Sequence, residues 1–396
     1  MKILFLSQVL SYPLDAGPKW RSYYVLRYLA EKHQITLVTF VRQQDSPAAI
    51  AHLESFCHQV HPVLLTRSRV RDAMDLASAL VQNKSFLIQR DDLGMMHARI
   101  SEIVAQETFD AVHADQLSMA HYALPLKMRR VLDEHNAVWK ITERMGENET
   151  NGLKRTLLTN EAAKLRAHEA RMMTQFDRII TVTPQDAQAL TFADAPPRAP
   201  FKTIPICIDP ATLPFKERTA SARNIIFMGG LLYPPNVDGV LWFARHALPQ
   251  IWAKFPDAKF FIVGARPPNS ITALGEQDSR IQVTGYVQDP AVYLDQSAVF
   301  VVPLRAGGGM RVKILDAWAR GIPMVTTTIG SEGIETISNE NILTADTPEA
   351  FAGAVIKLLQ DDAFARSVAV RGRAWVEQNY DWKKIYTAFD EIYPPA

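Results

Sequence analysis

The stretch FVVPLRAGGGMRVKILDAWARGIPMVTTT, residues 300–328, decides the fold. It predicts a buried strand at 300–304, a loop with three consecutive glycines, and a helix that begins near Arg311. Gly321 ends this helix, and a second strand follows Pro323. A strand, a glycine loop, a helix and a strand in this order form the repeating unit of an α/β fold with a parallel sheet.

The charges at the start of this helix are of the unfavourable sign. A helix N-terminus carries a partial positive charge, so Arg311 and Lys313 cost roughly 0.3 kcal/mol or more there unless an anion is bound. The three glycines allow backbone amides to approach a ligand closely; they are Gly307, Gly308 and Gly309. The stretch therefore predicts a phosphate site. The alternative is a surface helix in which Lys313 pairs with Asp316 three residues later.

The composition limits the class of protein. A chain of 396 residues predicts two or three domains, and 47% hydrophobic with 21% charged residues is typical of a globular protein. The net charge of +1 argues against a general nucleic-acid binder. Cys57 and Cys207 are expected to be free thiols. Because neither a signal peptide nor an apolar stretch of roughly twenty residues is visible, we expect a cytoplasmic protein.

Short β-rich runs alternate with helical patterns along the whole chain, which predicts an α/β fold of two Rossmann-like, doubly wound domains. We expect one long helix at 138–176 and a linker in the proline-rich region that follows the first half. In such sheets, ligands bind outside the carboxyl ends of the strands, so the cleft between the domains is the expected site. The predicted parts are a first domain at 1–195, a linker at 196–222, a second domain at 223–375, and a C-terminal helix at 376–396 that packs back on the first domain.

Several motifs of the second half resemble those of one family. Met228-Gly-Gly-Leu-Leu-Tyr-Pro-Pro-Asn236, Phe261-Ile-Val-Gly264, Gly285-Tyr-Val287 and residues 307–330 resemble the nucleotide-binding domain of the GT-B, family-4 glycosyltransferases. Asp133-Glu-His-Asn136 in the first half also resembles this family, so the likeness covers nearly the whole chain. It implies a second domain that binds a nucleotide-diphosphate sugar and a first domain that binds a glycan or lipid-linked acceptor. Transfer would retain the anomeric configuration, and the product would belong to bacterial surface polysaccharide.

The resemblance also assigns roles to residues. Of two family glutamates eight residues apart that flank the donor, the second matches Asp316 and the first falls on Gly308. Where many members carry an Arg and a Lys after the first strand of the second domain, this chain has Gly229 and Gly230, so Arg311 and Lys313 would replace those cations. His135 matches a histidine that touches the donor sugar. The expected donor-binding set is Gly229, Gly230, Tyr286, Val287, Gly307, Gly308, Gly309, Met310 and Asp316, and the expected catalytic set is His135, Arg311 and Lys313. Tyr286 and Val287 would line the base pocket, or else pack in the core.

Three residues of the first half are candidates for contact with the acceptor or a phosphate. Gly17 and Lys19 lie at the first strand-to-helix turn, and Asp115 follows a predicted strand. The alternatives are ordinary turn chemistry for the first two and a solvated loop acid for Asp115. A basic run of Arg67, Arg69 and Arg71 precedes an amphipathic stretch at 74–81, which indicates either contact with an anionic membrane or a solvated helix.

No DxD-like metal motif occurs in a suitable loop, and an Arg and a Lys can neutralise a leaving diphosphate directly, so we expect neither a metal nor a cofactor. Two other functions remain open. One is a nucleotide-sugar epimerase, which shares the two-domain architecture but needs acid and base carboxylates that Gly308 does not offer. The other is a degenerate nucleotide-sugar-binding subunit, which the missing first glutamate would permit.

Overall fold

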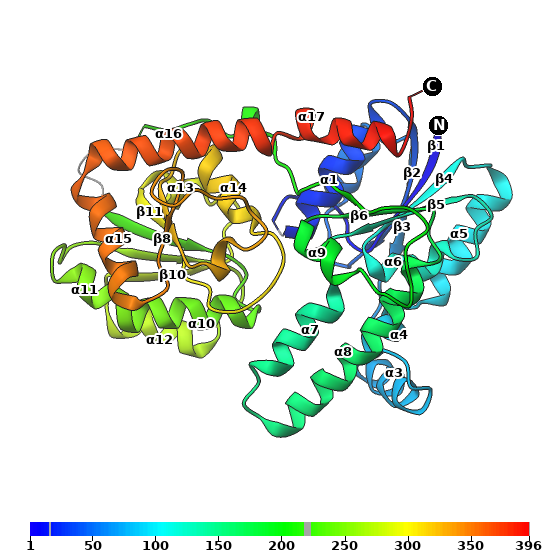
Figure 1. The fold of residues 1–396 in the computed structure, drawn as a ribbon, viewed down its shortest axis with the longest axis horizontal. Coiled ribbons are helices and arrows are strands. Elements are labelled where there is room, and N and C mark those ends of the chain that lie inside the picture. Colours follow the sequence, from blue (N-terminus) through cyan, green and yellow to red (C-terminus); the bar gives the residue numbers. More distant parts are fainter. Residues whose placement is uncertain (16, 218–222, 396) are drawn as a thin grey trace. The chain divides into compact units, whose positions relative to one another are not determined.

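A computed structural model describes residues 1–15, 17–217 and 223–395. The chain forms two compact units, one made of Met1–Cys207 with Ile385–Ala396 and the other of Ile208–Lys384. Figure 1 traces the elements of both. The boundary at Cys207 lies inside the predicted linker 196–222, of which residues 218–222 lie outside the described part of the chain. Residues 385–396 belong to the first unit. The C-terminal segment that rejoins the first unit therefore begins nine residues after 376, the predicted start of the C-terminal helix.

The first unit is built on a parallel sheet with the strand order β3-β2-β1-β4-β5-β6-β7 among the described residues. The order reverses direction between β1 and β4, which is the topological switch of a Rossmann-like fold. Leu4, Leu6, Val112 and Leu132 of the central strands are fully buried. The strands are β1 Lys2–Ser7, β2 Gln34–Val41, β3 Gln59–Leu64, β4 Ala111–Asp115, β5 Arg129–Glu134, β6 Arg178–Thr181 and β7 Lys202–Thr203.

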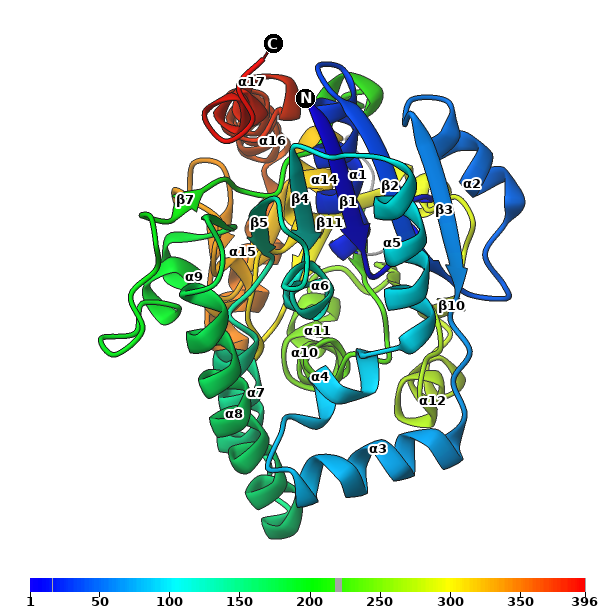
Figure 2. The same cartoon turned by 90° about the vertical axis from the view of Figure 1, so that its right-hand side faces the viewer.

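Helices connect these strands, and their starts follow local signals. Thr183 caps α9 by accepting from the amide of Asp186, with Pro184 at the first helical position. The predicted helix at 138–176 is instead two helices, α7 and α8, which lie side by side (Figures 1 and 2). The break occurs because Asn151 caps a new helix by accepting from the amide of Lys154. The helices are α1 Gly17–Ala30, α2 Pro47–Glu54, α3 Arg69–Val81, α4 Phe86–Asp91, α5 Gly94–Gln106, α6 Leu117–Ala123, α7 Val138–Glu147, α8 Gly152–Met173 and α9 Pro184–Ala189.

The second unit repeats this plan with the parallel strand order β10-β9-β8-β11-β12-β13 among its described residues. Its switch lies between β8 and β11. The strands are β8 Asn224–Met228, β9 Phe260–Val263, β10 Ile281–Gly285, β11 Ser297–Val302, β12 Met324–Thr326 and β13 Leu343–Thr344. The helices are α10 Pro234–Trp242, α11 Leu248–Trp252, α12 Asn269–Gln277, α13 Ala291–Asp295, α14 Val312–Ala319, α15 Pro348–Gln360, α16 Asp362–Asn379 and α17 Trp382–Ile385, with a π-helical turn at Phe243–Ala247.

Two parallel α/β sheets, each with a single switch point, confirm the predicted fold class. Within the first unit, the returning tail packs through its aromatic rings. Arg21 lies 5.4 Å from the ring centres of both Tyr386 and Phe389, and Tyr393 Oη lies 2.8 Å from His113 Nδ1. Cys57 and Cys207 are buried free thiols, as predicted.

Candidate donor site

The switch point of the second unit is formed by the loops that leave the carboxyl ends of β8 and β11. The β8 loop begins with Gly229 and Gly230, and the β11 loop spans residues 303–311 and contains the three glycines. Ligands of doubly wound sheets bind at this point because the flanking loops diverge there and leave a crevice. The structure thus brings the two predicted donor loops to the same end of one sheet.

The conformation of the glycine loop explains its sequence. Gly307 and Gly309 have φ values of +117° and +78°, which side-chain-bearing residues rarely adopt. A Cβ at Gly307 would stand 2.7 Å from Tyr233 Oη and 2.8 Å from Arg311 Nη2. Arg311 donates from Nη1 to the Gly308 carbonyl at 2.6 Å and occupies the N-cap of α14 without a side-chain cap bond. The loop therefore holds the guanidinium against the start of α14, while Met310 is buried beside it.

Lys313 reaches from α14 to the β8 loop. Its Nζ lies 3.1 Å from Asn236 Oδ1 and 4.5 Å from the ring centre of Phe227, and a Cβ at Gly229 would stand 2.5 Å from it. The glycine at 229 thus leaves the space that the ammonium group fills. Burial, together with the charge of Arg311, lowers the pKa of Lys313 to about 7.

Asp316 lies one turn further along α14. Its carboxylate is buried and accepts from Arg320 Nε at 3.2 Å. Burial raises the pKa of Asp316, although Arg320 acts against this shift. The alternative in which Lys313 pairs with Asp316 is wrong for the described structure, because each has another partner.

The β10 loop joins the same end of the sheet. The amide of Gly264 donates to the Gly285 carbonyl at 3.1 Å, and a Cβ at Gly264 would stand 2.0 Å from the Gly229 carbonyl oxygen. The loops after β8, β9 and β10 therefore approach each other closely through glycines. Tyr286 is 63% exposed, so core packing is excluded for its ring, and Val287 is half-buried.

In the first unit, the predicted residues gather at the carboxyl ends of β1, β4 and β5. Asp115 Oδ1 lies 2.9 Å from His135 Nε2, while Asp115 Oδ2 accepts from Ser7 Oγ at 2.9 Å and from Ser22 Oγ at 2.6 Å. Asp115 is fully buried at the end of β4, so the interpretation as a solvated loop acid is wrong. Burial acts to raise the pKa of Asp115, but His135 and the Ser22 hydrogen bond outweigh it and the pKa lies below its ordinary value.

The other two first-unit candidates lie at the start of α1. Gly17 is the first residue of this helix, and a Cβ there would meet open space. Lys19 Nζ forms an ion pair with Asp15 Oδ1 at 2.9 Å. The first turn of α1 contains no acidic residue, as in α14, but Lys19 already has a carboxylate partner.

Sequence reasoning missed a buried ion pair between Arg21 and Asp133 in the first unit. Arg21 Nε and Nη2 donate to the two oxygens of Asp133 at 3.0 Å each, and Nη1 donates to the carbonyls of Ile204 and Pro205 at 2.8 Å. Glu134 is fully buried. Burial is the main cause that raises the pKa of Glu134 well above its ordinary value, and the negative charge of Glu169 adds to this shift. The only signal for Arg21 was a cation on the apolar side of a predicted helix.

Comparisons with known proteins agree with the fold of both units. Residues 222–361 match the family model for glycosyl transferases group 1. An uncharacterized 44.6 kDa protein in the cps region of Klebsiella pneumoniae is 22% identical over 412 residues, which cover 98% of each chain. Two solved structures share the fold. Sucrose-phosphate synthase from Thermosynechococcus elongatus is 16% identical, with a TM-score of 0.72 over 99% of this chain and 98% of that one. Anabaena HepE in complex with UDP-glucose is 14% identical, with a TM-score of 0.67 over 99% of both chains. Residues 222–361 therefore match the glycosyl transferases of group 1, and the chain as a whole has the two-domain GT-B fold of these solved structures.

Proposed function

We propose that this enzyme transfers a sugar, with retention of configuration, from a nucleotide-diphosphate sugar to a glycan or lipid-linked acceptor in the assembly of a bacterial surface polysaccharide. The cps-region relative supports the polysaccharide context, and the UDP-glucose complex of HepE supports the donor class. We propose that sugar transfer takes place in the cytoplasm or at the inner face of the membrane.

The observation that carries the proposal is the placement of two cations at the β8–β11 switch. Lys313 fills the space above Gly229, and Arg311 lies at the start of α14, where helix amides also favour an anion. A leaving diphosphate develops negative charge as the glycosidic bond breaks, and preorganised cations stabilise that charge. We therefore propose that the diphosphate needs no divalent metal, and that Asp316 binds the ribose as an alternative to its partner Arg320.

The proposal is tested by incubating the protein with UDP-, GDP- and ADP-sugars and following the anomeric proton by NMR. We expect one donor to be consumed in the presence of EDTA, with the anomeric configuration retained in the product. A polyprenyl-linked or oligosaccharide acceptor should accelerate consumption. Inversion of configuration would contradict retention, a strict need for Mg²⁺ or Mn²⁺ would contradict the role of the cations, and conversion of the donor sugar without an acceptor would indicate an epimerase.

The exposed face of α3 supports contact with a membrane that carries a lipid-linked acceptor. Val70, Met74 and Val81 are 69%, 61% and 87% exposed, and their spacing places them on one face of the helix. Figure 2 shows α3 beside α4, with which it is in contact. Arg67 and Arg71 form ion pairs with Asp91 and Asp75, so the apolar face rather than the basic run is the stronger argument. The side chains of Arg69 and Leu80 lie outside the described structure. No helix in the described ranges is long and apolar enough to cross a membrane.

Replacing Met74 and Val81 together with aspartate is expected to lower binding to anionic vesicles at least tenfold, because burial of each apolar side chain contributes about 1.5 kcal/mol. Sedimentation with phosphatidylglycerol vesicles measures the bound fraction. Val370→Asp, at a 46% exposed position on α16, is the matched control. If the double variant sediments like the wild type, α3 is not the membrane-binding element.

A further inference from the structure

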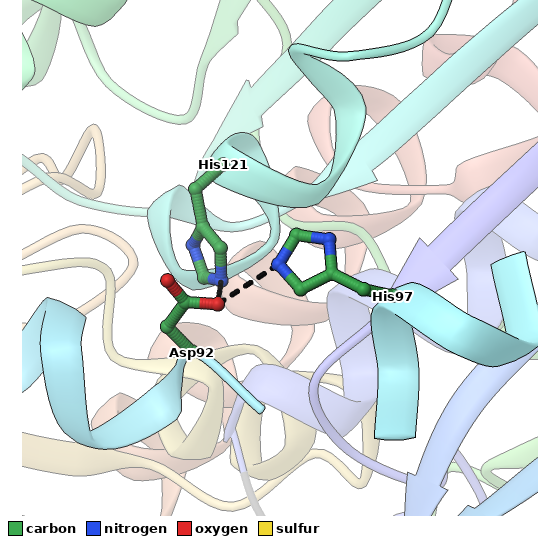
Figure 3. A group of neighbouring side chains, drawn as sticks. All are labelled: Asp92, His97 and His121. Carbon is green, nitrogen blue, oxygen red and sulfur yellow. Dashed lines mark hydrogen bonds and ion pairs between the residues drawn. The ribbon is translucent and has the colours of Figure 1, made fainter. Parts of the chain in front are cut away.

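A cluster of potential metal ligands lies in the first unit, apart from the residues considered above. Asp92 follows α4, His97 lies in α5 and His121 lies in α6. Asp92 Oδ1 is 2.9 Å from His97 Nε2 and 3.5 Å from His121 Nε2, and the three atoms lie within 4.8 Å of one another. Figure 3 shows both imidazoles pointing toward the same carboxylate.

These separations match those that a metal requires. Zinc binds imidazole nitrogen and carboxylate oxygen at 2.0–2.2 Å in a tetrahedral arrangement, so the ligand atoms lie about 3.3 Å apart. The two measured separations, 2.9 and 3.5 Å, lie on either side of this value. Two imidazoles and one carboxylate form the three-ligand set of zinc sites that keep one open position. Mg²⁺ is disfavoured because it prefers oxygen ligands.

A single buried tyrosine fixes all three ligands. The ring of Tyr122 lies 3.9 Å from that of His121 and 4.5 Å from that of His97, measured between ring centres. Its hydroxyl donates to the carbonyl of Asp91 at 2.6 Å and accepts from the amide of Leu93 at 2.7 Å, so it holds the backbone on both sides of Asp92. Preorganisation of this kind lowers the cost of assembling a site.

The environment permits entry of an ion. The side chains of Asp92 and His97 are 50% and 39% exposed, whereas that of His121 is 12% exposed. Within the described residues, neither ring nitrogen of His121 makes a hydrogen bond.

From this geometry we infer that Asp92, His97 and His121 form a binding site for a Zn²⁺-type divalent ion, with the fourth position open to solvent. Asp92 and His121 also line a cavity of about 390 Å³. The same cavity is lined by Lys84, Lys164 and Arg171, whose charges oppose a bare cation, so the fourth ligand is expected to be an anion such as hydroxide or a carboxylate. The site ties α4, α5 and α6 together and is independent of the proposed transfer chemistry.

The test is Zn²⁺ binding to the full-length, EDTA-treated protein, measured by calorimetry and by metal content after gel filtration. We expect one equivalent for the wild type and at least a tenfold loss of affinity for Asp92→Asn and for His97→Gln. Both positions are partly exposed, so these variants should keep their circular dichroism spectra. His58→Gln, at an exposed histidine outside the cluster, is the matched control and should bind like the wild type.

A second measurement distinguishes specific Zn²⁺ binding by the three ligands from nonspecific binding to surface histidines. Saturating Zn²⁺ should raise the melting temperature of the wild type and of His58→Gln, but not that of the Asp92→Asn, His97→Gln double variant. Mg²⁺ at the same concentration should leave all melting temperatures unchanged. The inference is overturned if the wild type binds no stoichiometric Zn²⁺, or if the double variant binds it with unchanged affinity.

Discussion

Replacing both Arg311 and Lys313 with alanine is expected to lower kcat/KM for sugar transfer by about 10⁴, and each single replacement by about 10². In the proposed reaction each cation faces charge that develops on the leaving diphosphate, and loss of one such contact costs roughly 2.7 kcal/mol. Initial rates with the best donor measure the effect. Arg305→Ala is the matched control, because Arg305 lies in the same loop but is about half exposed and paired with Asp238. Wild-type rates in the double variant would contradict the proposed site.

A pair of glycine variants tests the same cations without removing a charge. A Cβ at Gly229 would stand 2.5 Å from Lys313 Nζ and 3.0 Å from Asn236 Nδ2, whereas a Cβ at Gly353, on α15 and outside the donor site, would meet open space. Gly229→Ala should therefore displace the ammonium group and lower kcat/KM roughly tenfold or more, and Gly353→Ala should have little effect. Equal losses in the two variants would show that the position of Lys313 is not the cause.

The pH dependence of donor binding follows from the pKa of Lys313, which is about 7 in the free protein. A bound diphosphate favours the charged ammonium, so the pKa rises in the complex and a proton is taken up above pH 7. Below pH 7 the group is already charged, and affinity should be insensitive to it. Between pH 7 and the raised pKa, affinity should fall by up to tenfold per pH unit. Titrations in two buffers of different ionisation enthalpy measure the uptake, which Lys313→Met should abolish.

Replacing His135 with alanine is expected to lower kcat/KM for transfer by about 10² while the affinity for the free nucleoside diphosphate stays unchanged. Asp115 Oδ1 lies 2.9 Å from His135 Nε2, and a carboxylate at this position favours the tautomer with the proton on Nε2. The Nδ1 lone pair is then an acceptor, and within the described residues Nδ1 is buried without a hydrogen-bond partner. A sugar hydroxyl can donate to this atom. Transfer rates and calorimetric binding of the nucleotide separate the two effects.

The Asp115→Asn variant tests the tautomer of His135, because it changes the hydrogen-bond partner and leaves the imidazole ring in place. An asparagine amide can donate to Nε2, which forces the proton to Nδ1 and converts the acceptor into a donor. Transfer should fall to a similar extent, although His135 itself is intact. His61→Gln, at a histidine on β3, is the control. If Asp115→Asn retains full activity with an unchanged melting temperature, Asp115 does not position His135 for catalysis.

The fold was predictable because the alternation of strands and helices is a local property of the chain. The helix at 138–176 was the exception, although Asn151 is an ordinary N-cap residue and marks the start of a second helix. The conformation of the glycine loop was also predictable, since positive φ values at Gly307 and Gly309 and cations at a helix start are encoded within a few residues. Whether Asp115 is solvated or buried stayed open, because the sequence gives no measure of how deeply a strand end is buried.

The sequence by itself determined two Rossmann-like domains, a glycine loop with two cations, and the resemblance of these parts to one family. Only the tertiary structure decided that Lys313 occupies the space above Gly229, that Asp115 holds His135, and that Asp92 meets two histidines from other helices. The physical reason is that each of these contacts joins elements distant along the chain. Strand order and helix packing bring them together, and periodicity or residue spacing does not encode that arrangement.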